Sequence, residues 1–540
     1  MDDRIRAHAL QNALKYGAAR TGNVIPKIIG EFPDVKNDMQ ATKAKIDAIV
    51  ADVNTLSKED VREELEKHFP EMLEKKQPKK RELPPLQNAE DGKVVTRLPP
   101  EPSKYNHLGH ALTFLINAHY AKKYNGKLVL RFEDANPDKV SQEFVDEMLA
   151  DIKEYLGIHV AAVHFVSDDM EQLYTYAEQL LEKKVAYMCF CPKEEMGPKR
   201  RAGEACTCRE EHKDEWENFK NGKYMNGECV LRYKGDMQHK NSVLRDPVLF
   251  RAVQTPHFKQ GEQYKIWPLY DFYSAIEEHL CGVTHVIRSN EFDMRKELQE
   301  QLQEHLGLRK PEMIHYGRFN ISGATTKGRE IREKIESGEY IGWDDPRLVT
   351  LRALKRRGIQ KEAYETLIQH LGLSPYPVKL DFTMLAAENR KLLDATTNRY
   401  SFVADPVEVN IPDVEDHDVT LHLHPDKKEG GRVLHSKGEY LITKEDYEQS
   451  KGKTVRLMQD LTYKDGKVVE AKHDMIIHWL PQDGNVPVTV MMPDATKKKG
   501  MGEHTIKNLS VGDIVQFERF GFCKLDAVTD GVYEFWFTHE

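Results

Sequence analysis

The sequence predicts a multidomain α/β protein in which a parallel α/β domain is interrupted by an insertion. Strand and helix patterns alternate from residue 93, and a similar apolar strand returns at 283–287 after a cysteine-rich stretch. Short β segments separated by Gly, Pro and Asp turns fill the chain after residue 376, which is typical of a β-barrel. The length of 540 residues suits about three to five domains and excludes a single small module.

The N-terminal segment, residues 1–76, is rich in helix formers, and its apolar residues recur every three or four positions. Ser57 and Asp60 form a helix-capping signature before a predicted helix at 61–73. Prolines and charges at 77–92 predict an extended linker. We therefore expect a small helical domain that is connected to the rest of the chain by this linker.

The α/β domain is predicted in two halves. Its first half contains, in order, a strand at 94–96, a helix at 109–124, a strand at 127–132 and a helix at 143–156. This alternation favours a parallel sheet, because parallel neighbours need a crossover connection. The predicted boundaries are 93–185 for the first half, 186–263 for the insertion, 264–324 for the second half, 325–375 for a helical segment and 376–540 for the β-barrel region.

Composition restricts the class of protein. Hydrophobic residues make up 39% and charged residues 31% of the chain, with no run of about 18 apolar residues. The charged start, MDDRIRAHAL, is typical of neither a signal peptide nor an anchor, so we expect a cytoplasmic protein without a membrane partner. The net charge of -9 means that a nucleic acid would have to bind local basic faces. Three basic runs lie at 199–201, 355–357 and 497–499, although such runs are more often solvated faces.

Seven cysteines are present, and four of them are crowded together at Cys189, Cys191, Cys206 and Cys208. An odd number with this crowding favours a metal site in a reducing compartment over a disulfide framework. Four thiolates satisfy the tetrahedral geometry of Zn²⁺, so the pattern predicts a zinc site. Free buried thiols are the alternative, and His212 is an alternative fourth ligand.

A phosphate-binding turn is predicted at 97–110, RLPPEPSKYNHLGH, between the first strand and the first helix. Its prolines fix a rigid turn, and Gly109 admits close backbone approach at the start of the helix. His107 and His110 lie one turn apart and can donate to phosphate oxygens beside the positive end of that helix. An ordinary strand-to-helix turn is the alternative.

The stretch at 97–110 resembles the HIGH signature of class I aminoacyl-tRNA synthetases in the glutamyl/glutaminyl subgroup. The runs GWDDPR at 342–347 and LKRRG at 354–358 are similar to the pattern of the same subgroup. The resemblance covers about residues 93–540. It implies a Rossmann-type class I synthetase catalytic domain with an inserted acceptor-stem domain, a helical stem-contact domain and a β-barrel anticodon-binding region. That barrel is of the kind found in glutaminyl enzymes and in archaeal or eukaryotic glutamyl enzymes.

This resemblance implies a glutamate-tRNA ligase of the archaeal type. ATP and L-glutamate would form glutamyl adenylate, and the acyl group would then pass to the terminal ribose of tRNA(Glu). ATP chemistry implies Mg²⁺, and some glutamyl synthetases carry zinc in the insertion that holds the four cysteines here. Two alternatives stay open: a glutaminyl-tRNA synthetase, and a catalytically silent tRNA-binding paralogue. The sequence also leaves open whether tRNA(Gln) is a second acceptor.

The resemblance assigns an ATP site to the two signature motifs. His107, His110 and Lys327 are the predicted catalytic residues. Lys327 lies in ATTKGR at 324–329, the candidate for the family's KMSKS loop, and two glycines bracket it. No Met-Ser precedes the lysine, and a solvated basic loop is the alternative. The predicted ATP-binding residues are Pro100, His107, Gly109, His110, Lys327 and Arg329.

The resemblance also assigns a glutamate site. RFEDANP at 131–137 resembles the segment whose first acidic residue binds the α-ammonium group, which gives Glu133 that role. Tyr270 matches a tyrosine that lines the amino-acid pocket, and Arg97 matches an arginine near the glutamate. Arg288 stands where glutamate-specific relatives carry an arginine. A guanidinium pairs with a carboxylate as a fork but offers no acceptor to an amide NH2, which favours glutamate over glutamine. Without the resemblance, Arg97 and Arg288 would each be interpreted as an ordinary surface arginine.

Overall fold

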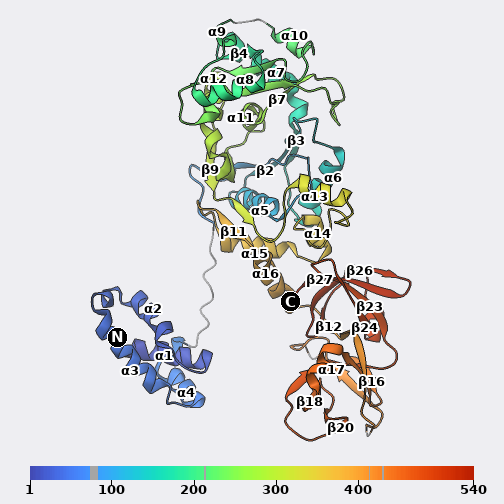
Figure 1. The fold of residues 1–540 in the computed structure, drawn as a ribbon. Helices are drawn as coiled ribbons and strands as arrows, with labels where there is room; N and C mark the ends of the chain where they lie inside the picture. Colours follow the sequence, from blue (N-terminus) through green and yellow to red (C-terminus); the bar gives the residue numbers. More distant parts are fainter. Residues whose placement is uncertain (73–82, 212–214, 413, 428–430) are drawn as a thin grey trace. The chain divides into compact units, whose positions relative to one another are not determined.

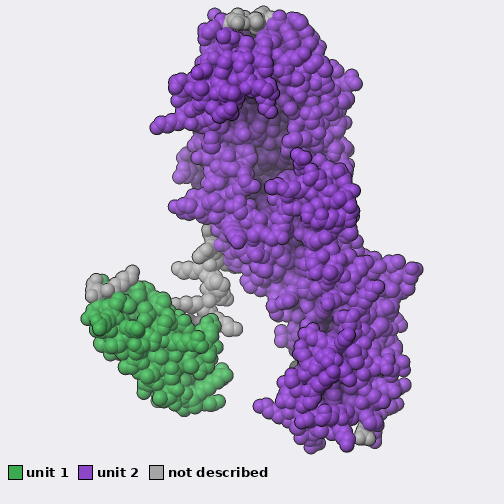
Figure 2. Space-filling view, viewed as in Figure 1, with its two compact units in different colours: residues 1–80 green, residues 81–540 purple. Residues whose placement is uncertain are grey.

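The computed structural model describes residues 1–72, 83–211, 215–412, 414–427 and 431–540. The chain divides into two compact units, Met1–Lys80 and Arg81–Glu540 (Figure 1, Figure 2). The second unit contains all of the residues predicted to bind ATP, glutamate or metal. His212, the alternative zinc ligand, lies outside the described residues.

The first unit is a small helical domain with its own apolar core. Its helices are α1 (Asp2–Tyr16), α2 (Thr21–Glu31), α3 (Met39–Val53) and α4 (Lys58–His68). Ser57 caps α4: its Oγ accepts from the Asp60 backbone N at 3.2 Å, and the Asp60 carboxylate accepts from the Ser57 backbone N at 3.3 Å. The capping signature is therefore confirmed, and the helix that it starts ends at His68.

The second unit is built on parallel strands, as expected after residue 93. These strands are β1 (Val95–Leu98), β2 (Lys127–Phe132), β3 (Ala162–Phe165), β8 (His285–Ser289) and β9 (Glu312–Tyr316). β1 pairs with β2 and β2 with β3, while β8 pairs with β9. Thr284 N donates to Val95 O at 2.9 Å where β8 meets β1. The three-stranded sheet β3-β2-β1 and the two-stranded sheet β8-β9 therefore meet at β1 and β8, where the strand order reverses.

Helices connect and cover these strands (Figure 1). They are α5 (Leu108–Lys123), α6 (Gln142–Ala150), α7 (Met170–Glu182), α11 (Tyr270–Leu280) and α12 (Lys296–Leu306). The helix expected at 143–156 ends its α-helical part at Ala150 and continues as a π-helical turn, Asp151–Tyr155, in which Leu156 N donates to Asp151 O at 2.9 Å. Apolar residues of α5, β1 and β2 share one core cluster, which fixes α5 against the sheet.

The insertion contains an antiparallel sheet in the order β4-β5-β6-β7. Its strands are β4 (Ala186–Cys189), β5 (Val230–Tyr233), β6 (Val248–Ala252) and β7 (Ile266–Pro268), and its helices are α8 (Lys193–Ala202), α9 (Cys208–Glu211) and α10 (Trp216–Lys220). Trp216, Phe219 and Phe250 of the insertion share a core cluster with residues of α7, α11 and α12. This packing joins the insertion to the helix that carries Tyr270.

A helical segment follows the parallel strands. Its elements are β10 (Phe319–Ile321), α13 (Gly328–Glu336), α14 (Leu351–Arg356), α15 (Lys361–Leu371), β11 (Val378–Leu380) and α16 (Phe382–Asp394). β10 and β11 pair in parallel. The segment stays helical to Asp394, whereas a β region was expected from 376. Asp381 caps α16 by accepting from Thr383 N at 2.9 Å, and Leu385 is fully buried in the core that contains residues of α15.

The C-terminal region is a curved sheet with the strand order β12-β25-β26-β27-β23-β24-β13. Its edge strands are separated in the sequence only by Ser401, so the sheet nearly closes into a barrel. The strands are β12 (Arg399–Tyr400), β13 (Phe402–Ala404), β23 (Val486–Met491), β24 (Lys497–Gly502), β25 (Ile514–Phe517), β26 (Gly521–Thr529) and β27 (Val532–His539).

Smaller sheets follow β13 in the chain. Their strands are β14 (Pro406–Asn410), β15 (His417–Leu421), β16 (Arg432–Ser436), β17 (Glu439–Thr443), β18 (Val455–Leu457), β19 (Thr462–Lys464), β20 (Lys467–Val468), β21 (Met475–Ile477) and β22 (Leu480–Pro481). The helix α17 (Lys444–Ser450) lies between two of these strands, β17 and β18. Across all of the described residues, no helix is both long enough and apolar enough to cross a membrane.

Candidate active site and metal centre

The two predicted catalytic histidines form the start of α5. Nδ1 of His107 accepts from Gly109 N at 3.1 Å, and His107 N donates to Nδ1 of His110 at 3.3 Å. The two rings stack with their centroids 3.8 Å apart. A Cβ added at Gly109 would lie 3.1 Å from Cε1 of His107, which is tighter than an ordinary contact. The close approach expected at Gly109 is therefore present.

Both imidazoles are neutral hydrogen-bond donors. Burial lowers the pKa of His107 to about 3, and it also lowers the pKa of His110 well below the ordinary value. The positive charge of Lys104 adds to both shifts. Because Nδ1 of each neutral ring accepts a backbone N–H, the ring proton must be on Nε2. Each ring can then donate its Nε2–H to a phosphate oxygen beside the positive end of α5.

A cavity of about 380 Å³ lies beside these histidines. Lys327 lines it, although its side chain is 77% exposed and its Nζ donates to Glu330 Oε1 at 2.7 Å. Lys104 and Arg318 bring two more cations to the wall, and we had not predicted either one. The structure therefore brings His107, Gly109, His110 and Lys327 to one cavity that suits a polyanion.

Two other predicted ATP-binding residues do not line this cavity. Arg329 is an exposed residue of α13, and its Nε donates to Glu333 Oε1 at 2.8 Å. Pro100 is buried, and its carbonyl oxygen accepts from Glu133 N at 2.9 Å. Pro100 therefore ties the signature turn to the end of β2. The ATP-binding roles of both residues stay predictions.

A buried network of charged residues lies at the carboxyl ends of β1 and β2. Arg97 Nε donates to Glu278 Oε1 at 3.0 Å, and Arg131 Nη2 donates to the same oxygen at 3.2 Å. Arg131 Nη2 also lies 3.0 Å from Glu133 Oε1. The Tyr273 hydroxyl donates to the other oxygen of Glu133 at 3.4 Å. Two predicted glutamate-binding residues, Arg97 and Glu133, are therefore connected through Arg131 and Glu278.

Arg288, at the end of β8, contacts the predicted pocket tyrosine. Its Nη1 donates to the Tyr270 hydroxyl at 3.2 Å, and its Nε donates to His315 Nε2 at 3.1 Å. Burial, followed by the charge of Arg288, lowers the pKa of His315 to about 4, so this ring is a neutral acceptor. Arg288 is only 5% exposed, and among the described residues it forms no ion pair.

The phosphate cavity and the charged network share one edge of the sheet. Ser289 and Tyr316, the last residues of β8 and β9, line the cavity, and Arg288 and His315 directly precede them. Arg97 lies near the end of β1, beside the point where the strand order reverses. Open α/β sheets bind ligands at the carboxyl ends of their strands at such a point.

Besides Lys104 and Arg318 of the cavity, four residues around the predicted glutamate site are missing from the sequence-based prediction: Arg131, Tyr273, Glu278 and His315. Arg131 lies in KLVLRF, an otherwise apolar strand, where a buried charge needs a partner. That signal points to a buried ion pair but does not name the partner. Glu278 comes from α11, 147 residues away in the sequence, so only the three-dimensional arrangement shows the pair.

The four clustered cysteines converge as predicted for a tetrahedral metal. The Sγ atoms of Cys189 and Cys206 are 3.7 Å apart, and those of Cys191 and Cys208 are 3.8 Å apart. All four Sγ atoms lie within 4.8 Å of one another. Zn–S bonds of about 2.3 Å in a tetrahedron require S···S separations of about 3.8 Å. The donor set therefore fits Zn²⁺ in both ligand type and spacing.

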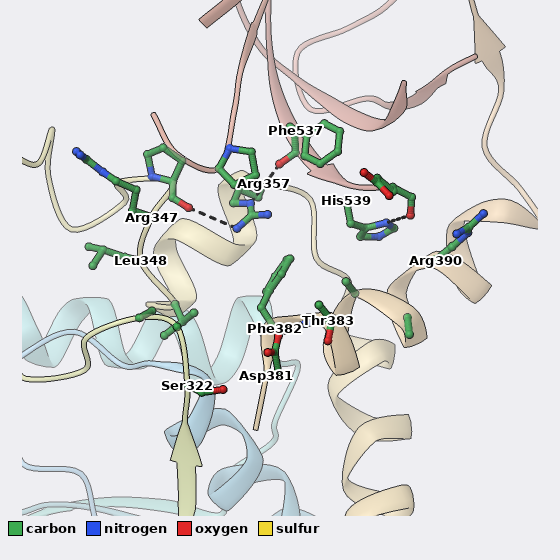
Figure 3. A pocket seen from close by; sticks show the side chains of 18 residues that line it. Ser322, Arg347, Leu348, Arg357, Asp381, Phe382, Thr383, Arg390, Phe537 and His539 are labelled. Atoms are coloured by element: carbon green, nitrogen blue, oxygen red, sulfur yellow. Dashed lines mark hydrogen bonds between the residues drawn. The ribbon is translucent and has the colours of Figure 1, made fainter. Parts of the chain in front are cut away.

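The basic run at 355–357 contacts the C-terminal region. Arg357 is buried, and its side chain donates to the carbonyl oxygen of Phe537 at 3.2 Å (Figure 3) and to that of Thr538 at 2.9 Å. Arg356 binds Asp526 with two hydrogen bonds of 2.9 and 2.7 Å and also donates to Asp344 at 2.7 Å. These two arginines therefore do not form the expected RNA-facing patch, because they join α14 to β26 and β27.

A cavity of about 680 Å³ lies at this junction (Figure 3). Arg357, Phe382 and Phe537 lie on its wall, together with Ser322 at the base of the Lys327 loop. The Arg357 guanidinium carbon lies 4.3 Å from the centroid of the Phe382 ring. Burial lowers the pKa of Arg357 to about 10, which is consistent with carbonyl and ring partners rather than a carboxylate.

The fold has the layout of a Rossmann-type catalytic domain, with a cationic cavity and a buried charged network at the carboxyl ends of its parallel strands. Residues 93–395 match the family model for the catalytic domain of class I tRNA synthetases (E and Q). Residues 397–480 and 476–526 match two models for the anti-codon binding domain of the same family. The chain belongs to the class I tRNA synthetases of the E and Q group, which confirms the predicted fold class and family.

Relatives of this chain include archaeal proteins of similar length. The glutamate–tRNA ligase of Pyrococcus furiosus is 39% identical, with 96% of each chain covered. The glutamate–tRNA ligase of Methanosphaera stadtmanae is 36% identical, with 100% of each chain covered. A glutamate tRNA ligase of Elizabethkingia meningosepticum, solved with its amino acid, has a TM-score of 0.42 and 19% identity, covering 57% of this chain and 70% of that one.

Proposed function

We propose that this chain is a glutamate-tRNA ligase that activates L-glutamate with ATP and transfers it to tRNA(Glu). The observation that carries this proposal is the buried guanidinium of Arg288, which has neutral partners but no carboxylate among the described residues. A buried cation without a counter-ion is costly, and a substrate carboxylate supplies that counter-ion. Glutamine would supply an amide, whose NH2 meets only donors on a guanidinium.

The first step joins the amino acid to AMP. Glu133 binds the α-ammonium group and Arg288 the side-chain carboxylate, so that the α-carboxylate faces the phosphate cavity. One oxygen of that carboxylate attacks the α-phosphorus of ATP as the bond to the β-phosphate oxygen breaks and pyrophosphate leaves. His107, His110 and Lys327 stabilise the charge that develops on the phosphates, and positioning supplies the rest of the acceleration.

The second step moves the acyl group to RNA. A hydroxyl of the terminal ribose attacks the carbonyl carbon of the adenylate, its proton is lost, and AMP leaves. We assign the acceptor stem to the insertion at 186–263, the inner stem to the helical segment at 325–394 and the anticodon to the β-rich region at 397–540. The two anti-codon binding domain models support the last assignment.

Two metals belong to this proposal. Cys189, Cys191, Cys206 and Cys208 would hold Zn²⁺, which would cross-link the turn after β4 to the start of α9 and so stabilise the insertion. Mg²⁺ would arrive with ATP and neutralise its phosphates. The cysteines, which form no disulfide among the described residues, and the use of ATP both support the cytoplasm as the compartment.

A charging assay tests the proposed function. The chain is incubated with ATP, labelled glutamate or labelled glutamine, and either tRNA(Glu) or tRNA(Gln). We expect glutamate on tRNA(Glu), and the second acceptor shows whether tRNA(Gln) is also used. Glutamine as the charged amino acid would identify a glutaminyl-tRNA synthetase. No charging by folded protein that binds tRNA would identify a silent paralogue.

A further inference from the structure

The network behind the glutamate site contains four buried charged groups. Arg97, Arg131 and Glu278 are 1%, 0% and 3% exposed, and Glu133 is 8% exposed. Their charges cancel when both carboxylates are ionised, since two guanidinium groups face two carboxylates. Burial disfavours the Glu278 carboxylate, but Arg131 and then Arg97 outweigh this effect and lower its pKa. Glu278 is therefore an anion within this network.

Glu278 competes with Glu133 for one guanidinium. Arg131 Nη2 is 3.0 Å from Glu133 Oε1 and 3.2 Å from Glu278 Oε1, so one nitrogen is shared between the two carboxylates. The same Glu278 oxygen also accepts from Arg97. Nε and Nη1 of Arg131 have no hydrogen-bond partner among the described residues. Without Glu278, Arg131 could offer a two-pronged pair to Glu133, which would occupy the carboxylate that the substrate ammonium needs.

We infer that Glu278 is a positioning residue for glutamate binding: it holds Arg97 and Arg131 at the ends of β1 and β2 and so leaves Glu133 available to the α-ammonium group of the substrate. This inference rests on the proposed function, because it assigns a role within the same glutamate site. Glu278 does not contact the reacting atoms. It acts on the substrate through Arg131 and Glu133, and it lies five residues after Tyr273 and eight after Tyr270 on α11.

The neighbouring residue Glu277 provides a matched control. It is also on α11 and is fully buried, but it forms no ion pair with Arg97 or Arg131 among the described contacts. Burial raises the pKa of Glu277 to about 8, so this side chain is protonated at neutral pH. Glu277→Gln therefore replaces one neutral group by another of the same size. Glu278→Gln replaces an anion that faces two arginines.

The first measurement is pyrophosphate exchange with tRNA(Glu) present, over a range of glutamate and of ATP concentrations. For Glu278→Gln we expect the glutamate KM to rise about 10- to 100-fold while the ATP KM stays within about twofold. Glu277→Gln should keep both wild-type values. Glu278→Asp keeps the charge but cannot reach both arginines, so its glutamate KM should rise by less, about three- to tenfold. A wild-type glutamate KM for Glu278→Asp overturns the inference even if Glu278→Gln fails to fold.

The second measurement is the pH profile of kcat/KM for glutamate, which a purely structural role would not change. The pKa of Glu133 is raised by burial and by Glu278, while Arg131 and Arg97 act in the opposite direction. Loss of the Glu278 charge should therefore move the acid limb of Glu278→Gln to lower pH by about half a unit or more. An acid limb identical to that of Glu277→Gln contradicts the inference. The groups that face Glu133 are Arg97, Arg131, Tyr270, Tyr273 and Glu278.

These outcomes separate the inference from the proposed function. If the wild-type chain fails to activate glutamate, the proposed function is wrong, and there is no wild-type activity with which to compare the variants. If the wild-type chain activates glutamate and the Glu278 variants match it in KM and in pH profile, only the positioning role is wrong. A KM unchanged for glutamate but raised for ATP would also overturn the inference, because Glu278 has no contact with the phosphate cavity.

Discussion

Arg288 and Tyr270 are joined by a hydrogen bond of 3.2 Å that links the end of β8 to the first residue of α11. The phenol holds the guanidinium without neutralising it. Burial, together with the charge of Glu133, raises the pKa of Tyr270, so the phenol stays protonated. Before a substrate arrives, the cation is therefore oriented and has no counter-ion among the residues that the structure describes, which lowers the cost of ordering it when the carboxylate binds.

Replacing Arg288 tests the basis of amino-acid choice. Arg288→Gln should lower kcat/KM for glutamate about 100- to 1000-fold, a loss of about 3–4 kcal/mol, because it removes one side of a buried charge pair. The control is Arg332→Gln, which removes an exposed arginine of α13 outside the cavity. Exchange kinetics for both variants give the comparison. Unchanged glutamate kinetics in Arg288→Gln would show that Arg288 does not bind the side-chain carboxylate of glutamate.

Lys327 should act mainly on the transition state. The preceding Gly323 has a φ of 83°, a conformation that favours glycine, and the lysine itself is exposed and forms an ion pair with Glu330. An ammonium group that arrives when the loop closes adds more to the transition state than to ATP binding. Lys327→Ala should therefore lower the exchange kcat about 100-fold, or about 3 kcal/mol, with little change in the ATP KM.

The matched control for this loop is Lys334→Ala. Lys334 is also on α13 and pairs with Glu339 at 2.7 Å, but it does not line the cavity. Its kcat should stay at the wild-type value. A normal kcat for Lys327→Ala, or a defect confined to the ATP KM, would transfer the role to another cation of the wall, and Lys104 would be the first candidate.

Zinc should be present in about one equivalent per chain. Metal analysis of native protein and of Cys206→Ser measures this, with Cys523→Ala as the control because Cys523 is buried in the C-terminal sheet away from the cluster. We expect Cys206→Ser to lose most of the metal and Cys523→Ala to retain it, because loss of one of four thiolates opens the tetrahedron. Less than about half an equivalent in native protein, with no effect of Cys206→Ser, would favour free thiols.

Two basic residues should differ in how they affect tRNA binding. Lys498 is exposed on β24, whereas Arg356 binds Asp344 and Asp526. If Lys498 contacts a phosphate, Lys498→Ala should reduce the slope of log K against log salt by about 0.7–0.9. Arg356→Ala should keep that slope but lower the stability of the second unit by about 1 kcal/mol, seen as a lower Tm. Equal loss of slope in both variants would contradict the assignment of Arg356 to the junction.

Local patterns predicted the elements, and contacts between distant segments decided the rest. The apolar run at 127–132 has the bounds of β2, and Ser57 with Asp60 marked the start of α4. The run at 355–357 looks like an RNA patch in the sequence, because its partners in the C-terminal region, Asp526, Phe537 and Thr538, lie about 170–180 residues away. Glu278 could not be predicted for the same reason: its partners Arg97 and Arg131 lie far from it in the sequence, on two strands of the sheet.

The measurement that tests the central claim most directly is pyrophosphate exchange by the wild-type chain with glutamate and with glutamine, each with and without tRNA(Glu). The account predicts exchange with glutamate and a kcat/KM for glutamine lower by a factor of about 1000 or more, because the Arg288 guanidinium offers no acceptor to an amide. Equal or faster exchange with glutamine would contradict the account.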